Sequence, residues 1–101
     1  MRITTPSWLD EIEEKLAAKH AVSCDEAEEA LGDAVLFRYC ERGSRPGEDL
    51  YSAFGRTDAG RLLMVFFVYK RDQSALITSA RDMSGSERRY YERQGSPSRR
   101  H

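Results

Sequence analysis

The most continuous apolar segment of the chain is Leu62–Tyr69, with the sequence LLMVFFVY. An apolar run of this length is typical of a central β-strand that is covered on both faces. The segment Thr57–Gly60 before it has the residues of a hairpin turn, and its glycine can adopt positive φ. Because Leu50–Arg56 precedes this turn, the pattern predicts two antiparallel strands joined by a hairpin.

Two other segments are predicted to be strands. Ala34–Cys40 places Val35 and Phe37 at alternate positions, as a strand with one buried face does. Ala75–Ala80 follows the apolar strand after a short polar turn at Lys70–Ser74. Because consecutive strands joined by short turns must pair antiparallel, we expect a meander of about four strands.

Three segments have the features of helices. The first is predicted from Ser7 to about His20, where apolar residues recur at helical spacing. The second begins at Ser23, which has the S-x-x-E spacing of a capping box, and is expected to stop at Gly32. Ser84 opens the third with the same spacing. The apolar positions of these helices suit packing against the sheet.

The order of these elements predicts an α+β fold in two layers. Two N-terminal helices precede an antiparallel β-meander sheet of about four strands, and a C-terminal helix follows it. We expect residues 1–94 to form a single domain that starts with a frayed end at 1–6. Residues 95–101 are rich in Ser, Pro and Arg and are expected to be a disordered basic tail.

Charge is distributed unevenly along the chain, although the net charge is only −1. Residues 1–33 carry nine acidic and three basic side chains, whereas residues 81–101 carry six basic and three acidic ones. This asymmetry fits a molecule with two partners of opposite charge. It fits equally well two solvated faces that bind nothing, so charge alone does not decide between them.

Several classes of protein are excluded or disfavoured by the sequence. No apolar run approaches the roughly 20 residues that span a bilayer, and the first residues lack the apolar region of a secretory signal. A cytoplasmic location is therefore expected. Cys24 and Cys40 are not in a metal-binding spacing, and we expect both to be reduced. With two histidines and no Gly-rich phosphate loop, neither a metal site nor a cofactor is predicted.

The candidate chemistry is a set of cationic and phenolic side chains near the ends of the predicted strands. A metal-independent ribonuclease needs cations that hold the scissile phosphate, together with a base and an acid for proton transfer. Arginine suits the first task because its planar fork stays charged and grips phosphate oxygens. The alternative for any one arginine is a solvated charge or an ion pair. The candidates are Arg56, Arg61, Arg81, Arg88, Arg89, Tyr90 and Tyr91.

Proton transfer could be supplied by Lys19, His20, Glu48 or a tyrosine if the fold brings one of them near the arginines. By default His20 is a partner of the helix C-terminus. Of the adjacent Tyr90 and Tyr91, one is expected to be a core contact rather than both being platforms for bases. The residues thus indicate a small α+β domain suited to RNA binding or cleavage.

Three motifs in order resemble a known family, the BrnT toxins of bacterial type II toxin–antitoxin modules. Lys19–Ser23, followed by Glu26 and Ala27, resembles the family's K-H-G-V-S-F-x-E-A opening. Phe54–Leu63, FGRTDAGRLL, is similar to its L-G-R-T-x-x-G-R-L-L hairpin. Thr78–Arg81 with Glu87–Tyr91 is similar to its I-S-A-R-x-A-x-x-x-E-R-R-x-Y ending.

The resemblance covers about residues 8–92 and implies both a fold and an activity. It implies a compact RelE-like domain that cleaves RNA, inhibits translation and is neutralised by a BrnA-like antitoxin with a ribbon-helix-helix domain. DNA would then be contacted only through the antitoxin, and a homodimer in the complex is left open. Within this hypothesis the catalytic candidates are Arg56 and Arg81 as phosphate ligands and Lys19 and His20 for proton transfer or substrate positioning, with Glu48 the weaker candidate. The candidates for RNA binding are Arg61, Arg88, Arg89 and Tyr91.

Three positions depart from the family pattern. Ala21 stands where the family has glycine, so the turn between the first two helices is expected to differ. Leu50 stands where the family often has arginine; Arg42 or Arg45 would have to substitute for it, or activity is weakened. The chain is also expected to begin with a helix, whereas many relatives begin with a short strand.

The leading hypothesis is a metal-independent toxin ribonuclease. The rival is a non-catalytic binding module that only associates with an antitoxin-like protein, and Leu50 is its best support.

Overall fold

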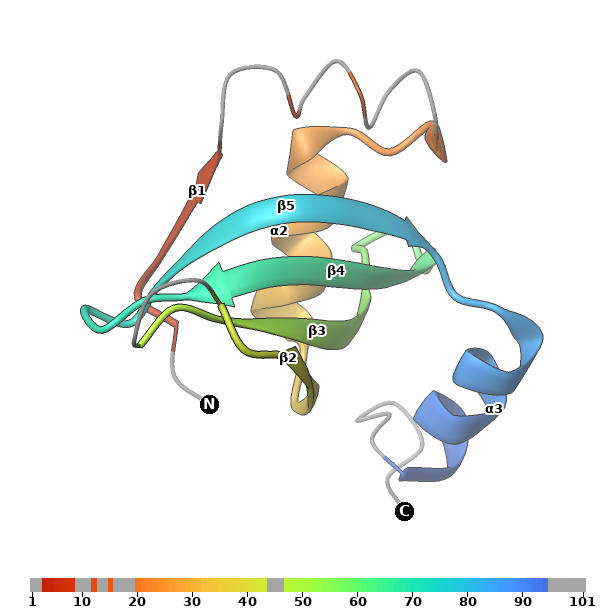
Figure 1. The fold of residues 1–101 in the computed structure, drawn as a ribbon. Helices are drawn as coiled ribbons and strands as arrows, with labels where there is room; N and C mark the ends of the chain where they lie inside the picture. The colour runs from red at the N-terminus through yellow and green to blue at the C-terminus, as the bar shows by residue number, and fades with distance from the viewer. Residues whose placement is uncertain (1–2, 9–11, 13–14, 16–19, 44–46, 95–101) are drawn as a thin grey trace.

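A computed structural model describes residues 3–8, 12, 15, 20–43 and 47–94 of the chain. In these residues a single mixed sheet is flanked by helices (Figure 1). The four predicted strands are confirmed to within two residues at each end. The elements are β1 (Thr5–Trp8), α2 (Cys24–Asp33), β2 (Leu36–Glu41), β3 (Asp49–Arg56), β4 (Leu62–Tyr69), β5 (Ser74–Asp82) and α3 (Gly85–Gln94).

The sheet has the strand order β1-β5-β4-β3-β2. Strands β2 to β5 form the predicted antiparallel meander, and β4 is at its centre. The β3–β4 turn is the predicted hairpin, in which the Gly60 N–H donates to the Thr57 carbonyl oxygen at 2.9 Å and Gly60 adopts a φ of 96°. The core of the sheet was therefore predictable from its apolar pattern.

Strand β1 corrects the prediction for the N-terminus. Ser7 is not a helix cap; it lies opposite Leu76 in a parallel pairing with β5, and Trp8 lies opposite Ile77. Without β1, the edge of β5 would expose a row of unpaired backbone groups. Pro6 is tolerated because an edge strand can spare one backbone donor. Helical spacing in the sequence could not reveal a partner strand at the other end of the chain.

The rest of the first predicted helix lies mostly outside the described residues, although Ile12, Lys15 and His20 are helical. The predicted tail at 95–101 lies outside them as well. The expected fold, a RelE-like domain with two N-terminal helices and about four strands, does not match the structure well in its details. The described residues form a five-stranded mixed sheet that begins with a strand.

Helix α2 begins at the predicted capping box. The Ser23 side chain accepts from the Glu26 backbone N–H, and the Glu26 carboxylate accepts from the Ser23 N–H, both at 3.1 Å. Gly32 does not end the helix; α2 continues to Asp33 and Ala34 is its C-cap. Its buried residues Ala27, Ala30 and Leu31 pack on β3 and β4.

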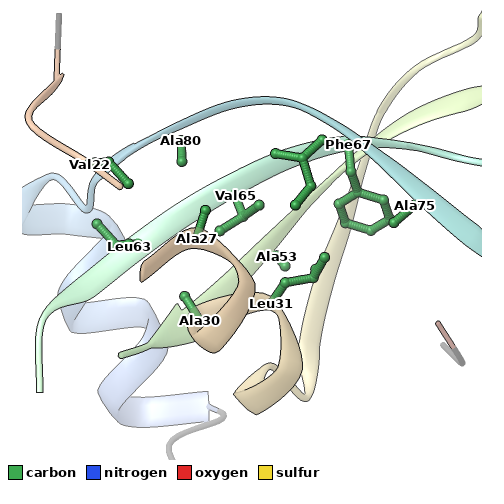
Figure 2. Close-up of a cluster of buried hydrophobic side chains, with 11 residues drawn as sticks. Val22, Ala27, Ala30, Leu31, Ala53, Leu63, Val65, Phe67, Ala75 and Ala80 are labelled. Carbon is green, nitrogen blue, oxygen red and sulfur yellow. The ribbon is translucent and has the colours of Figure 1, made fainter. Parts of the chain in front are cut away.

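The side chains of α2 meet Ala53, Val65 and Phe67 from the sheet in one buried cluster (Figure 2). Small residues bring the helix close to β3. A Cβ atom added at Gly55 would overlap the carbonyl oxygen of Ala30, so glycine is required at this contact. Helix α2 therefore packs with its backbone directly against β3.

A second buried cluster lies on the other side of the sheet, at the end where β5 stops and α3 begins (Figure 1). Tyr91 of α3 and Met83 pack there against Phe54 of β3 and Met64 of β4. The Ser84–Glu87 capping box forms as predicted and begins α3 at Gly85. The central strand β4 is thus covered on both faces.

Candidate active site

Three arginines lie on the sheet face away from α2, which we call the α3 face. Met64, which packs against Tyr91, pairs with Arg81 and with Phe54 in the strand register. Side chains alternate between faces along a strand, and paired residues share a face. Arg81 therefore lies on the α3 face of β5. Ser52, Phe54 and Arg56 are alternate residues of β3, so all three lie on this face. Arg38 lies on it as well, because Arg38 pairs with Ser52.

Arg81 is held in a bidentate ion pair. Its Nη1 and Nη2 atoms donate to the two carboxylate oxygens of Glu87 at 2.7 and 2.8 Å, and Nη1 also donates to the Asp82 carbonyl oxygen at 3.1 Å. Its guanidinium carbon lies 5.4 Å from the centre of the Phe66 ring. The guanidinium of Arg81 is thus held in place, and its charge is compensated by a carboxylate.

Glu87 links this ion pair to the start of α3. The Ser84 backbone N–H donates to Glu87 Oε1 at 2.8 Å. The hydrogen bond from Arg81 is the main cause that lowers the pKa of Glu87 to about 2, with the Ser84 N–H adding to it. A carboxylate with this pKa is a poor base at neutral pH. Its role is to orient Arg81 and to cap the helix.

Arg38 is an arginine that the sequence interpretation missed. Its guanidinium carbon lies 5.0 Å from the centre of the Phe54 ring and 5.6 Å from that of Tyr90. No carboxylate among the described residues lies within 4.0 Å of it. Its position between Phe37 and Tyr39 in a strand was the available signal, because it places a charge on the opposite face from two aromatic rings.

Arg61, predicted to bind RNA, is occupied by contacts within the chain. Its Nε donates to Asp82 at 2.8 Å, and Nη1 donates to Glu26 at 3.2 Å and to the Ala21 carbonyl oxygen at 2.8 Å. Nη2 donates to the His20 carbonyl oxygen at 3.2 Å. The hydrogen bond to Asp82 is the main cause that raises the pKa of Arg61. Arg61 therefore joins the segment before α2 to the end of β5.

Arg56 and His20 lie at the same end of the sheet as Arg81. The Arg56 backbone N–H donates to Asp33 Oδ2 at 3.2 Å, and no carboxylate of the described residues forms an ion pair with its side chain. His20 is half-buried near Asp82. Hydrogen bonds from Arg61 are the main cause that lowers the pKa of Asp82, and the charges of Arg88 and His20 lower it further.

Glu48 is not brought to this end of the sheet. It precedes β3, whereas Arg56 ends that strand, so the two are roughly 26 Å apart at about 3.3 Å per residue. Its carboxylate lies 4.0 Å from Lys70 Nζ at the far end of β4. The structure therefore does not bring Glu48 together with Arg56 and Arg81. Lys19 lies outside the described residues.

The residues of α3 that were predicted to bind RNA differ in their exposure. Arg88 and Arg89 are exposed. Tyr91 is only 2% exposed within the second buried cluster, so it cannot present its ring to a base. Tyr90 is half-buried and contacts Arg38 and Phe54 at the surface. One of the two tyrosines is a core residue, as predicted, and Tyr90 is the one left at the surface.

The structure also shows what surrounds Leu50, the residue that stands where the family often has arginine. Leu50 lies two residues before Ser52 in β3 and therefore shares the α3 face with it. Arg38 pairs with Ser52 from the neighbouring strand β2, so it carries a cation on this same face. Arg42 is exposed just after β2, and Arg45 lies outside the described residues.

No group of His, Cys, Asp and Glu side chains in the described part of the chain could hold a metal ion. Cys24 and Cys40 are not joined to each other by a disulfide. Neither described helix has the length and apolar character needed to cross a membrane.

Comparison with known proteins identifies the family of the chain. The family model described as the ribonuclease toxin BrnT of type II toxin–antitoxin systems matches residues 8–87. The chain belongs to the BrnT family. The first two motifs and the third as far as Glu87 lie within the matched residues, so the resemblance in the sequence is confirmed.

A solved structure supports the fold of this BrnT chain. The crystal structure of the Brucella abortus ribonuclease toxin BrnT is similar with a TM-score of 0.53 at 18% sequence identity. The similarity covers 80% of this chain and 99% of the Brucella chain. No curated protein matches the sequence. The family membership therefore rests on the family model, and the crystal structure supports the fold.

Proposed function

We propose that this BrnT chain is an endoribonuclease that cleaves RNA without a metal ion, inhibits translation in the cytoplasm and is neutralised by a BrnA-like antitoxin. The observation that carries the proposal is the α3 face, where Arg56 and Arg81 lie at one end of the sheet. The family description, a ribonuclease toxin of a type II system, supports the same activity.

In the proposed reaction the arginines stabilise the charge that develops on the scissile phosphate. Arg81 is oriented by Glu87, so the cost of ordering its side chain is already met. Arg56 supplies a second cation on the same face. His20 is the described candidate for proton transfer, and Lys19 is the adjacent one. The ribose 2′-OH serves as the nucleophile, which makes a metal-bound water unnecessary.

The test is cleavage of a mixed RNA substrate by the purified protein in the presence of EDTA. We expect the wild type to cleave, and Arg81→Ala to lose about a hundredfold or more in rate, because a preorganised cation contributes at least that much. Growth arrest on induction should be lost in parallel. The matched control is Arg71→Ala, an exposed arginine in the β4–β5 turn. Full activity of a folded Arg81→Ala protein would exclude the catalytic role of Arg81.

The antitoxin is proposed to bind the face that carries α2 and to contact DNA itself, so that the toxin meets DNA only indirectly. An apolar cleft of about 330 Å³ lies there between Pro6, Leu31 and Phe37. Val35 follows Ala34, which lines this cleft, and is 63% exposed. An apolar side chain from a protein partner would remove this surface from water.

A second function is favoured by one observation. Because both terminal nitrogens of Arg81 already bind Glu87, a phosphate has to compete with a carboxylate for them. A non-catalytic module that only associates with an antitoxin-like protein would have no need for a free arginine there. Absence of RNA cleavage by a folded wild type that still binds its antitoxin would favour this module.

A further inference from the structure

We propose that Arg38 binds a phosphate of single-stranded RNA on the α3 face, at a subsite separate from the predicted catalytic arginines. This inference rests on the proposed function, because it concerns how the same RNA would be held. Arg38 is at the outer strand of the sheet, and its guanidinium lies over the rings of Phe54 and Tyr90.

The first argument is that the charge of Arg38 is uncompensated. Arg61 and Arg81 each bind carboxylates of this chain, Asp82 and Glu26 for the first and Glu87 for the second. Arg38 forms no such ion pair with any of the residues that the structure describes. An exposed cation without a carboxylate is free to accept a phosphate as its counter-charge.

The second argument is that Arg38 is already ordered. Its guanidinium lies 5.0 Å from the centre of the Phe54 ring and 5.6 Å from that of Tyr90, within the range of cation–π attraction. Phe54 is itself buried, and Tyr90 contacts it at 5.4 Å between ring centres. Contacts with aromatic rings leave the five N–H donors of the guanidinium available, so little entropy is lost when an acceptor binds.

The third argument is the surface that connects Arg38 to the predicted catalytic group. A row of paired residues crosses the sheet from Arg38 of β2. It continues with Ser52 of β3, Phe66 of β4 and Ser79 of β5. Arg81 stands two residues after Ser79 and contacts Phe66. Three strand spacings of about 4.8 Å place Arg38 roughly 14 Å from the strand of Arg81.

This row is suited to a nucleic acid strand. Arg38 on β2 and Arg81 on β5 would hold phosphates, and the half-buried ring of Phe66 on β4 lies between these two strands. Arginines combined with aromatic rings are the usual surface for single-stranded nucleic acid. An acidic peptide could use the cations but would gain little from the rings, so RNA is the ligand that the row favours.

The test measures binding of a 2′-O-methyl RNA oligonucleotide, which lacks the nucleophilic hydroxyl and therefore cannot be cleaved through it. Fluorescence anisotropy at several salt concentrations gives the affinity and its salt dependence. Arg38→Ala is expected to weaken binding about tenfold, the effect of one charge-assisted hydrogen-bonding group. It should also lower the slope of log K against log salt by about 0.7, the value for one phosphate contact on a single strand.

Three further variants separate charge, stacking and global effects. Arg38→Lys keeps the charge and should retain the slope with an intermediate affinity, because it loses the planar fork. Tyr90→Leu removes one of the two rings and should weaken binding about threefold. Arg71→Ala removes an exposed arginine at the opposite end of the sheet and should bind like the wild type. Thermal unfolding confirms that each variant is folded.

Cleavage of ordinary RNA, measured in parallel, separates this inference from the proposed function. If the wild type cleaves RNA and Arg38→Ala binds the oligonucleotide as tightly as the wild type, the subsite is excluded and the ribonuclease stands. If the wild type does not cleave but Arg38→Ala still binds about tenfold more weakly, the subsite stands without the ribonuclease. Unchanged RNA binding together with a weakened antitoxin complex would assign Arg38 to a protein partner instead and overturn the proposal.

Discussion

Glu87 and Arg81 form an ion pair that serves both structure and site. The Glu87 side chain is only 15% exposed, and it accepts hydrogen bonds from both Arg81 and the Ser84 backbone. Removing its charge would free Arg81 and weaken the start of α3 together. The pair therefore couples the stability of α3 to the orientation of the predicted catalytic cation.

The pH dependence of stability should reveal this pair. The folded state lowers the pKa of Glu87 from 4.5 to about 2, chiefly through Arg81. A depressed pKa stabilises the folded state fully above pH 4.5, and the contribution is lost as the pH falls towards 2. We expect Glu87→Gln to lower the free energy of unfolding by about 1–2 kcal/mol at pH 7, after allowance for solvent screening.

Urea unfolding at pH 7 and at pH 3 measures this effect. The difference in free energy of unfolding between wild type and Glu87→Gln should be smaller at pH 3. At this pH the lowered pKa of Glu87 stabilises the folded wild type less than it does at pH 7. Glu92→Gln, at an exposed position on the same helix, is the control and should change stability little at either pH. Equal destabilisation of Glu87→Gln at both pH values would contradict the electrostatic explanation.

At the scale of elements, the contact between α2 and β3 depends on a missing side chain. A Cβ atom at Gly55 would overlap the Ala30 carbonyl oxygen, and neither backbone can move without separating the helix from the sheet. Gly32 on the same helix has nothing within 4 Å of the position a Cβ would take. The two glycines therefore have opposite tolerance for the same substitution.

Gly55→Ala is expected to lower the free energy of unfolding by about 3 kcal/mol or more, because the added methyl group overpacks a contact between two backbones. Gly32→Ala is the matched control. It should raise stability by about 0.5–1 kcal/mol, since alanine favours an exposed helical position. Chemical denaturation of the two variants measures both effects, and a neutral Gly55→Ala would show that α2 does not pack as described.

At the scale of the whole molecule, charge is separated between the two faces of the sheet. Helix α2 carries five acidic residues and no basic ones, whereas α3 carries three arginines, Arg88, Arg89 and Arg93, against two acidic residues, Glu87 and Glu92. The asymmetry along the sequence thus becomes an asymmetry between surfaces. RNA is expected to approach the α3 face, and the acidic face is left to a partner of opposite charge.

The double variant Arg88→Glu/Arg89→Glu tests this arrangement. It should weaken binding of single-stranded RNA about tenfold or more and reduce the slope of log K against log salt by about 1.4, because two phosphate contacts are removed. Lys15→Glu/Arg71→Glu makes the same change in net charge at two exposed positions outside α3. Equal weakening by both double variants would mean that net charge, rather than the α3 face, controls binding.

The sequence by itself determined those parts of the fold that depend on local chemistry. The strand at Leu62–Tyr69, the hairpin at Gly60 and the capping boxes at Ser23 and Ser84 all follow from neighbouring residues, and all were predicted correctly. The family motifs are equally local, so the membership could be proposed before the structure was known. Local patterns carry this information because turns, caps and alternation need only a few consecutive residues.

Only the tertiary structure decided which elements meet and what each arginine contacts. Strand β1 exists because β5 offers a parallel edge from the other end of the chain. Arg61 and Arg38 are chemically identical, yet carboxylates surround the first and aromatic rings the second. Glu48 was separated from Arg56 by the length of a strand. Contacts of this kind join residues that are distant in sequence, and side-chain alternation could not locate them until the strand order was known.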